Sequence, residues 1–533
     1  MRIFVLLAPA VAAACCVPLA SARAQSSGGV APETSLLPQV GSLRQQIEDV
    51  VTPAATRREG WTVTPAIDLQ EVWSDNVTRA NGHRSSEFIT NITPSLAVSG
   101  TSARLTGDLN YAPRVSLYPE DGRQNRVAQN LTASGEAELL PEELFVDVRG
   151  YAATSAQNGY YGTTGSTQLN RDNEIQTYDF SVAPKYVHKF ASVAILNLGA
   201  SMERFQSQTS NMATNSALYH QSSTTERGYG KLSTGEDFGR LLDALSVDAS
   251  ETQGSGVLTR SHRTTVSNDA EYAITRYLSV LGGIGYEDIR YSGTSSIVVN
   301  DMTWNTGIRL TADSDTTLLV QYGHHDGGNS VSADGSWAPT AKLRLYARYS
   351  EGLSTSAEDT AQLMSSTQAT ASGLLIDKAT GMPVVSSSAY FSQQNSLTWL
   401  RSGSVSAALL EPRDTYSATV SHQERELRSA ASLSVYGNTN SASNSTYGSL
   451  AWQHDLQPDL SSNLSAQYGV TDAHTTSGSN TDNDSLVLNT GLTYRLSETA
   501  TLSLQYTYTQ QWGHLYGTAP TSNIVLATAH KSF

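Results

Sequence analysis

The sequence predicts an all-β protein, a transmembrane, antiparallel, up-and-down β-barrel of about 22 strands, with roughly 16 to 24 as the accepted range. Charged residues make up 16% of the 533-residue chain, yet the mean hydropathy is −0.30, so its polarity comes from Ser, Thr, Asn, Gln and Gly. From Trp61 onward apolar and polar residues alternate with the two-residue period of a strand. Past the N-terminus, no apolar run reaches the roughly 20 residues of a membrane helix.

Residues 1–24 have the layout of a secretory signal peptide. Arg2 supplies the positive charge, residues 3–14 are apolar, and Ala22-Arg23-Ala24 gives the small-x-small pattern for cleavage near Ala24. A membrane anchor is the alternative, but the apolar stretch is short and prolines interrupt it. Together with the barrel pattern, this segment predicts the outer membrane of a Gram-negative bacterium.

The two cysteines, Cys15 and Cys16, both lie in the signal peptide. Lipidation of Cys15 is a weaker alternative, because no Leu precedes the small residues before it. We therefore expect the mature chain to have no disulfide and no cysteine metal site. The net charge is −15, and removing Arg2 and Arg23 leaves 32 basic against 49 acidic residues, which argues against a nucleic-acid partner.

Residues 25–60 form a polar leader and linker. Leu43, Ile47 and Val50 have helical spacing, so a short amphipathic helix and an unstructured periplasmic tail both fit. A leader of this length is too short for the plug domain of a TonB-dependent transporter. Residues 61–533 are assigned to the barrel.

The alternating pattern is clearest in residues 501–512 and recurs in 485–496, 460–471 and 301–312. In 501–512, Leu502, Leu504, Tyr506 and Tyr508 share one face, and Thr501, Ser503, Gln505, Thr507 and Thr509 share the other. A soluble β-sandwich also alternates, but its outer face usually carries charge. Small uncharged polar residues, with aromatics gathered near strand ends, favour a barrel in lipid.

Connections between these strands alternate between short and long, which is typical of outer-membrane barrels with short periplasmic turns and long external loops. The short ones are 100–101, 140–143, 188–190, 275–277, 313–315, 339–340, 411–414, 457–459 and 497–499. The long ones are 74–86, 157–175, 208–221, 352–390, 429–445 and 472–483. All short turns fall on one side if the first strand runs outward from the periplasm.

The chain ends on an alternating strand with Phe533. A terminal aromatic in this setting resembles the signal that the barrel-assembly machinery reads, so Phe533 is the candidate assembly signal. Lys531 stands where that signal usually has an apolar residue.

Residues 61–118 carry a family resemblance. They contain Trp61-Thr-Val-Thr-Pro65, Trp73-Ser-Asp-Asn-Val77, Phe88-Ile-Thr-Asn-Ile-Thr-Pro94 and Ser102-Ala-Arg-Leu-Thr-Gly-Asp-Leu-Asn-Tyr111, with further likeness at Leu144-Phe-Val-Asp-Val148, Gly373-Leu-Leu-Ile-Asp377 and Gly381-Met-Pro383. The chain thus resembles the β-barrel porins found beside exopolysaccharide and PEP-CTERM/exosortase gene clusters. The resemblance covers most of the mature chain with loose motifs. It implies an outer-membrane barrel active in polysaccharide export or surface assembly, and it implies no catalytic residues.

The sequence contains no strong catalytic, cofactor-binding or metal-binding motif, so we expect no enzyme activity, no cofactor and no metal site. His324-His325-Asp326 lacks further ligands at metal spacing. The run 480–484 has the acidic and amide residues of a calcium loop, but lacks its Gly and terminal Glu. No nucleophile elbow and no phosphate loop occurs. An outer-membrane hydrolase with residues spread over several strands is the least favoured reading.

Alternation places a set of charged residues on the lumenal face. They are Arg104, Asp108, Arg114, Glu136, Glu138, Asp147, Arg149, Arg309, Lys342, Arg344, Arg348 and Arg495. Most are expected to pair across neighbouring strands and fix register. As pore-lining candidates we take Lys342, Arg344, Arg348, Arg309 and Arg495; the first three share one face of one strand and could attract an anionic sugar chain.

Two function classes follow. One is a porin-like channel or accessory pore for exopolysaccharide export or small-solute passage. The other is a structural or docking barrel in surface polysaccharide assembly, its lumen closed by residues 352–390 or by the leader. Expected partners are outer-membrane lipid and lipopolysaccharide, the barrel-assembly machinery, and polysaccharide or export-complex proteins.

Overall fold

The computed structural model describes residues 60–77, 84–156, 169, 174–209, 220–292, 296–313, 315–369, 375–384, 397–429, 440–475, 480–513 and 521–533. The predicted signal peptide and leader lie outside the described residues. So does the greater part of several predicted long connections.

The strands that the chain forms first are β1 (Gly60–Ser74), β2 (Glu87–Thr101), β3 (Leu105–Tyr111), β4 (Arg114–Leu117), β5 (Arg126–Ala128), β6 (Leu131–Leu140), β7 (Leu144–Ala156), β8 (Glu174–Phe190), β9 (Ala194–Thr209), β10 (His220–Thr234), β11 (Leu241–Gly254), β12 (Ser261–Ala273) and β13 (Leu278–Tyr291). They are followed by β14 (Ile297–Thr311), β15 (Thr317–His325), β16 (Gly328–Trp337), β17 (Leu343–Thr355), β18 (Thr367–Ala369), β19 (Leu375–Asp377), β20 (Leu397–Leu410), β21 (Asp414–Leu427), β22 (Asn440–Gln457), β23 (Leu460–Thr475), β24 (Asn480–Ser497), β25 (Ala500–Gly513) and β26 (Thr521–Ser532). The helical pieces are η1 (Gly122–Gln124), η4 (Glu236–Phe238), η5 (Gly256–Leu258) and α3 (Ser356–Ser366).

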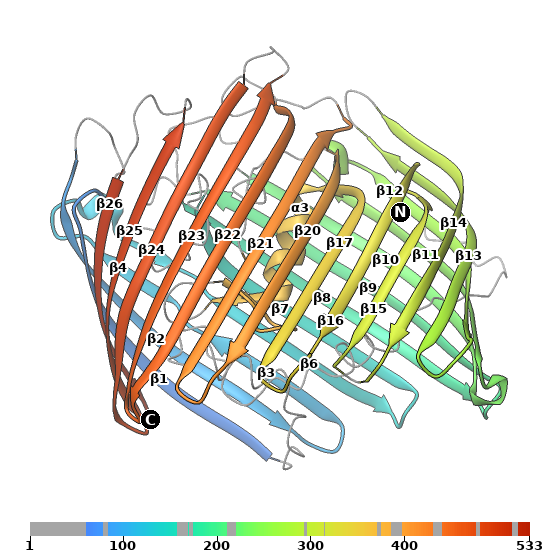
Figure 1. The fold of residues 1–533 in the computed structure, drawn as a ribbon, viewed down its shortest axis with the longest axis horizontal. Helices are drawn as coiled ribbons and strands as arrows, with labels where there is room; N and C mark the ends of the chain where they lie inside the picture. Colours follow the sequence, from blue (N-terminus) through green and yellow to red (C-terminus); the bar gives the residue numbers. More distant parts are fainter. Residues whose placement is uncertain are drawn as a thin grey trace, which may run out of the picture.

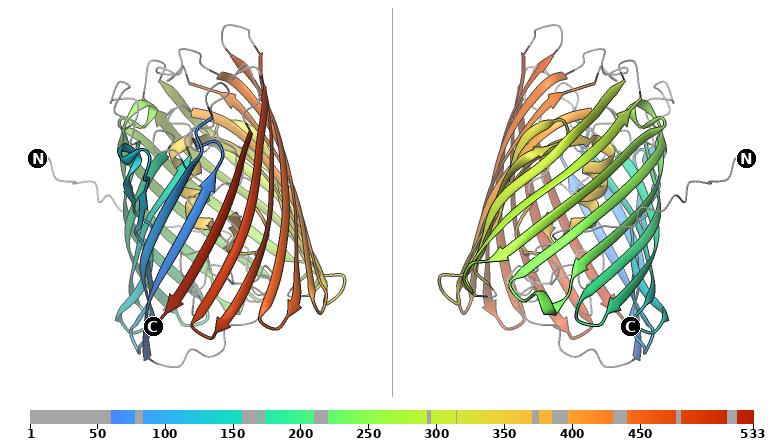
Figure 2. Two further views of the ribbon diagram at one scale, coloured as in Figure 1. Left: turned by 90° about the vertical axis from the view of Figure 1, so that its left-hand side faces the viewer. Right: turned by 90° about the vertical axis from the view of Figure 1, so that its right-hand side faces the viewer.

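All of these strands except β18 and β19 belong to one sheet that closes on itself (Figures 1 and 2). β1 pairs antiparallel with β2 on one side and with β26 on the other, from Ala66↔Ser532 to Ser74↔Ile524. β4 continues β3 along β2, and β5 runs into β6, so the wall is a closed antiparallel barrel of 22 strands. The predicted fold class and strand number are confirmed.

Hydrogen bonds also join the inner faces of neighbouring strands across the seam between β26 and β1. The Ser116 hydroxyl donates to the Asn91 side-chain oxygen Oδ1 at 2.7 Å, and Asn91 Nδ2 donates to Gln70 Oε1 at 3.0 Å. The Gln70 amide then donates to the Thr528 hydroxyl at 3.1 Å. This row, which we call the seam chain, links β4, β2, β1 and β26.

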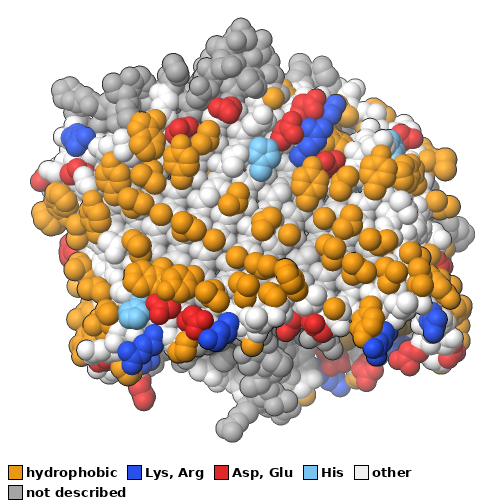
Figure 3. All heavy atoms as spheres, in the orientation of Figure 1, with side chains coloured by type: hydrophobic (Ala, Val, Ile, Leu, Met, Phe, Trp, Pro, Cys, Tyr) orange, Lys and Arg blue, Asp and Glu red, His pale blue; other side chains and the backbone are white. Residues whose placement is uncertain are grey.

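The apolar face of each strand points outward. Leu504 and Leu464 are 54% and 47% exposed, and Met302 is 67% exposed, whereas Thr507 and Thr509 on the inner face are fully buried. Figure 3 shows hydrophobic side chains across the middle of the outer wall and charged ones along its two rims. An apolar band between polar rims is the surface of a barrel that lies in lipid, and the predicted face assignment is confirmed.

The two ends of the barrel differ. β1 begins and β26 ends at the same end, which we call the turn end because the predicted short connections lie there within a few residues of their observed positions. Residues 235–240 form an additional turn at this end. The opposite end is the loop end.

Short connections also occur at the loop end, which the sequence pattern did not predict. β15 and β16 are joined by Asp326 and Gly327 alone, with φ of 58° and 73°. Two positive φ values in a two-residue hairpin suit the right-handed twist of the strands, and Asp and Gly are residues that adopt them. Residues 255–260, which include η5, make a second short connection.

The chain between β17 and β20 turns into the barrel. Its described part, residues 356–369 and 375–384, comprises α3 and the hairpin β18–β19, and we call it the inserted segment. Figures 1 and 2 show α3 inside the wall. Among the described residues, no helix is long and apolar enough to span a membrane.

Candidate functional site

The lumenal wall has two contrasting arcs. From β21 to β25 its buried polar side chains are almost all hydroxyls and amides: Thr415, Ser417, Thr419, Gln423, Ser445, Ser449, Gln453, Ser465, Gln467, Ser485, Asn489, Thr507, Thr509 and Gln511, with Arg425 the charged exception. Several bond to one another, as in Thr507 to Asn489 at 2.7 Å. We call this the neutral arc.

The arc from β6 to β17 carries paired charges instead. Arg309 of β14 reaches over β13 to Glu271 of β12, with Nε–Oε1 and Nη2–Oε2 both 3.0 Å, and both side chains are buried. Lys185 approaches Glu136 at 3.4 Å and Asp147 at 3.8 Å. These pairs link strands around the lumen, as expected for inward charges that fix register.

The inserted segment is anchored at the start of α3. Thr355 and Glu358 form a capping box, in which the Glu358 backbone N–H donates to the Thr355 hydroxyl and the Thr355 N–H donates to the Glu358 carboxylate. Asp359 then pairs with Arg425 of β21 at 2.6 Å, and both side chains are less than 10% exposed. A buried ion pair with a fixed helix start holds α3 against the neutral arc.

The hairpin of the inserted segment packs against the same wall. Ile376 and Met382 are buried with Ala408 of β20 and Ala451 of β22, and Tyr346 of β17 packs beside them. The Asp377 carboxylate accepts from the Ala379 and Thr380 N–H groups at 2.9 Å, which shapes the tip.

The tip reaches toward the opposite arc. Lys378, next to Asp377 at the tip, lies within electrostatic range of Arg149. Arg149 belongs to β7, which lies about halfway round the strand order from β17. The inserted segment therefore extends from the wall at β17–β22 toward β7 and narrows the lumen.

Three of the pore-lining candidates were predicted on one strand, and the structure separates them. Lys342 precedes β17 in the turn at the turn end, where its ammonium pairs with Glu411 at 2.7 Å. Arg344 lies on β17 close to the Tyr346 side chain, and its Nε is buried without a hydrogen-bond partner among the described residues. Arg348 faces Asp334 of β16 at 2.9 Å, and both side chains are more than half exposed to the lumen. Two of the three basic side chains, Lys342 and Arg348, therefore have an acidic partner.

The other candidates lie near the turn end. Arg309 is buried in its pair with Glu271. Arg495 donates to the Pro458 carbonyl at 2.6 Å beside a turn. The Phe533 N–H donates to the Pro65 carbonyl at 2.9 Å, and its ring is 73% exposed. The pore-lining and assembly roles of these residues stay predictions.

His324 and His325 at the loop end contact neighbouring protein side chains. His324 hydrogen-bonds to Asp301 at 3.0 Å and to Asn329 at 2.9 Å. His325 lies 3.1 Å from Asp326, which also pairs with Arg263 of β12. In the described part of the chain, no group of three or more His, Cys, Asp or Glu side chains could hold a metal ion.

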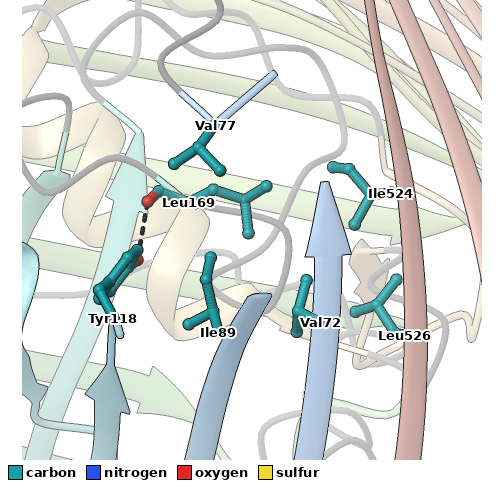
Figure 4. Close-up of a cluster of buried hydrophobic side chains, with 7 residues drawn as sticks. All are labelled: Val72, Val77, Ile89, Tyr118, Leu169, Ile524 and Leu526. Atoms are coloured by element: carbon teal, nitrogen blue, oxygen red, sulfur yellow. Dashed lines mark hydrogen bonds between the residues drawn. The ribbon is translucent and has the colours of Figure 1, made fainter. Parts of the chain in front are cut away.

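Sequence reasoning missed the apolar clusters on the inner wall at the loop end. One cluster contains Val72, Val77, Ile89, Tyr118, Leu169, Ile524 and Leu526, with the Tyr118 hydroxyl donating to the Leu169 carbonyl at 2.7 Å (Figure 4). Four members lie on strands at positions that alternation assigns to the polar face, so the pattern hides them: Val72, Ile89, Ile524 and Leu526. The anchor of α3 was also missed, although Thr355-Ser-Ala-Glu358 is a readable capping box.

The comparisons with known proteins support the fold but identify no family for this chain. No family model and no curated protein matches the sequence. Two structures of the FrpB iron transporter from Neisseria meningitidis align with a TM-score of 0.51 and 10% identity. The apoprotein F5-1 variant covers 88% of this chain and 81% of its own, and the F3-3 variant covers 91% and 83%. The ferric-catecholate import receptor Fiu from E. coli K12 aligns at a TM-score of 0.48 and 11% identity over 90% of this chain and 82% of its own.

Proposed function

We propose that this chain is an outer-membrane channel whose lumen is narrowed by the inserted segment. The observation that carries the proposal is the position of α3 and β18–β19 inside the barrel, fixed by the Asp359–Arg425 pair. A segment anchored to one arc and extending toward the other defines the narrowest passage. A polar inner wall with exposed charged side chains such as Arg348 and Asp334 supports a water-filled lumen.

Conductance of the full-length protein in planar lipid bilayers tests the proposal. We expect discrete conductance steps from the wild type. A variant in which a short Gly/Ser linker replaces residues 356–384 should conduct several times more per step, because the narrowing is gone. Heat-modifiable migration on gels would show that both proteins are folded. Silence of both folded proteins would contradict a channel function.

A closed docking barrel is the second candidate, and the apolar clusters at the loop end favour it. These clusters bring Val257 and Leu258 of η5 and Ala357 of α3 together with inward side chains such as Ile289. In that case the wild type should be silent, and only the variant without residues 356–384 should conduct. The same experiment therefore separates the two classes.

The nature of the solute is a further part of the proposal. The resemblance to porins of exopolysaccharide gene clusters suggests a sugar. Neutral oligosaccharides should then reduce the ion current of the open channel in a concentration-dependent way. Uncharged polyethers of equal size should reduce it less.

A further inference from the structure

Three charged side chains are buried together on the inner wall near the loop end. They are Arg114 of β4, Arg126 of β5 and Glu174 at the start of β8. Arg114 is 9% exposed and Glu174 is 3% exposed. All three lie within electrostatic range of Tyr118, which is a member of the apolar cluster shown in Figure 4.

Glu174 forms an ion pair with Arg126. Its carboxylate contacts Arg126 Nε, while Arg126 Nη1 donates to the Tyr118 hydroxyl at 2.6 Å. These three side chains thus comprise one carboxylate and two guanidinium groups, and the carboxylate directly contacts Arg126.

Arg114 lacks an ion pair and a hydrogen-bond acceptor among the described residues. Its Nε and Nη2 atoms are both buried without a partner. A buried cation without a direct partner is strongly unfavourable, because burial removes its hydration, and the nearby Glu174 carboxylate makes its direct contact with Arg126. Such a group indicates a missing counter-charge.

The two orphaned nitrogens also have the geometry for one particular kind of anion. Nε and Nη2 lie on the same edge of the guanidinium plane, and their N–H bonds point in parallel. This edge matches two oxygens of a single carboxylate or phosphate group. Because the edge is covered by protein, neighbouring side chains must shift to admit the anion, which restricts the ligand to a compact group.

We propose that Arg114, supported by Arg126, forms an oxyanion-binding site on the lumenal wall at the loop end, for the carboxylate or phosphate group of a small solute. The site is separate from the inserted segment and from the basic residues of β17. It therefore goes beyond the proposed channel function and does not depend on it.

Thermal unfolding of the full-length protein in detergent tests the site without any transport assay. Sodium chloride, sodium acetate and sodium phosphate are compared at equal ionic strength and pH. We expect acetate or phosphate to raise the wild-type midpoint in a saturable way, because a ligand bound only by the folded state stabilises it. The difference between the two salts tells which oxyanion fits.

Arg114→Met should remove this response. In chloride it should also unfold at a higher temperature than the wild type, because it removes an uncompensated buried charge. Arg428→Met is the matched control, because Arg428 pairs with Glu426 at 3.2 Å and both side chains are more than 40% exposed, and its oxyanion response should equal that of the wild type.

Two results would overturn the proposal: a wild-type midpoint that is the same in all three salts, or an unchanged oxyanion response in Arg114→Met. If Arg114→Met does not fold, Arg114→Lys serves instead. It keeps the charge but loses the two-donor edge, so its response should be several times weaker. A full response from Arg114→Lys would also rule out recognition by that edge.

Discussion

Leu504 and Gln505 are neighbours in β25, and their side chains lie on opposite faces of the wall. Leu504 is 54% exposed on the outside, while Gln505 belongs to the inner face with Thr507 and Thr509. At this scale the sequence was informative, because a two-residue period fixes which side chains share a face. It could not tell which inward charges pair, since partners such as Arg309 and Glu271 come from strands that are not neighbours.

Leu504→Arg should destabilise the barrel by about 2–4 kcal/mol, because it places a cation in lipid near the middle of a strand. Gln505→Arg should be tolerated, because its side chain faces the lumen. Urea unfolding of both variants from lipid vesicles measures the difference. Equal losses of stability would mean that the two faces have been assigned wrongly.

The inserted segment is the element whose position the sequence left open. Residues 352–390 were predicted as a long connection that could close the lumen, and the described part of it does fold inward. Its location depends on Asp359 meeting Arg425, which are 66 residues apart in the sequence. An ion pair between residues so far apart produces no periodic pattern in the sequence. Only the capping box at Thr355 could therefore have marked the start of α3.

Arg425→Gln should release the inserted segment. The change leaves Asp359 buried without its cation, at a cost of about 3–5 kcal/mol. The matched control is Arg428→Gln in the same region, where Arg428 pairs with Glu426 at 3.2 Å and both side chains are more than 40% exposed. Loss of that surface pair should cost about 0–1 kcal/mol.

Limited proteolysis measures this release. Cleavage within residues 356–384 should be much faster in Arg425→Gln than in the wild type, and Arg428→Gln should resemble the wild type. Equal cleavage in Arg425→Gln and the wild type would show that the hairpin packing around Ile376 is sufficient to hold the segment.

At the scale of the whole molecule, the strand number and closure were predictable because every wall strand has the same kind of pattern. Short loop-end connections were not, since Asp326 and Gly327 look like part of one longer stretch until their φ values are known. The terminal strand shows why Lys531 departs from the expected apolar residue. It lies on the outward face at the turn end, where its ammonium donates to the Thr499 hydroxyl at 2.5 Å and approaches the Phe533 ring at 5.9 Å.

Deleting Phe533 should lower the amount of folded, heat-modifiable barrel recovered from the outer membrane. The residue provides an exposed aromatic ring at the end of β26 and the hydrogen bond to Pro65. Phe533→Tyr keeps both and should assemble normally. Normal assembly of the truncated chain would show that the signal lies elsewhere in β26.

The seam chain has a consequence for the order of biosynthesis. Gln70 and Thr528 are 458 residues apart, and β1 pairs with the last strand of the chain. β26 must have been synthesised before β1 finds that neighbour, and contacts of such sequence separation are slow to form. Until then the backbone N–H and C=O groups along one edge of β1 are unpaired, and strands of other chains can hydrogen-bond to them. Protection of this edge during transit should therefore limit the yield of the protein more than the rate of its synthesis.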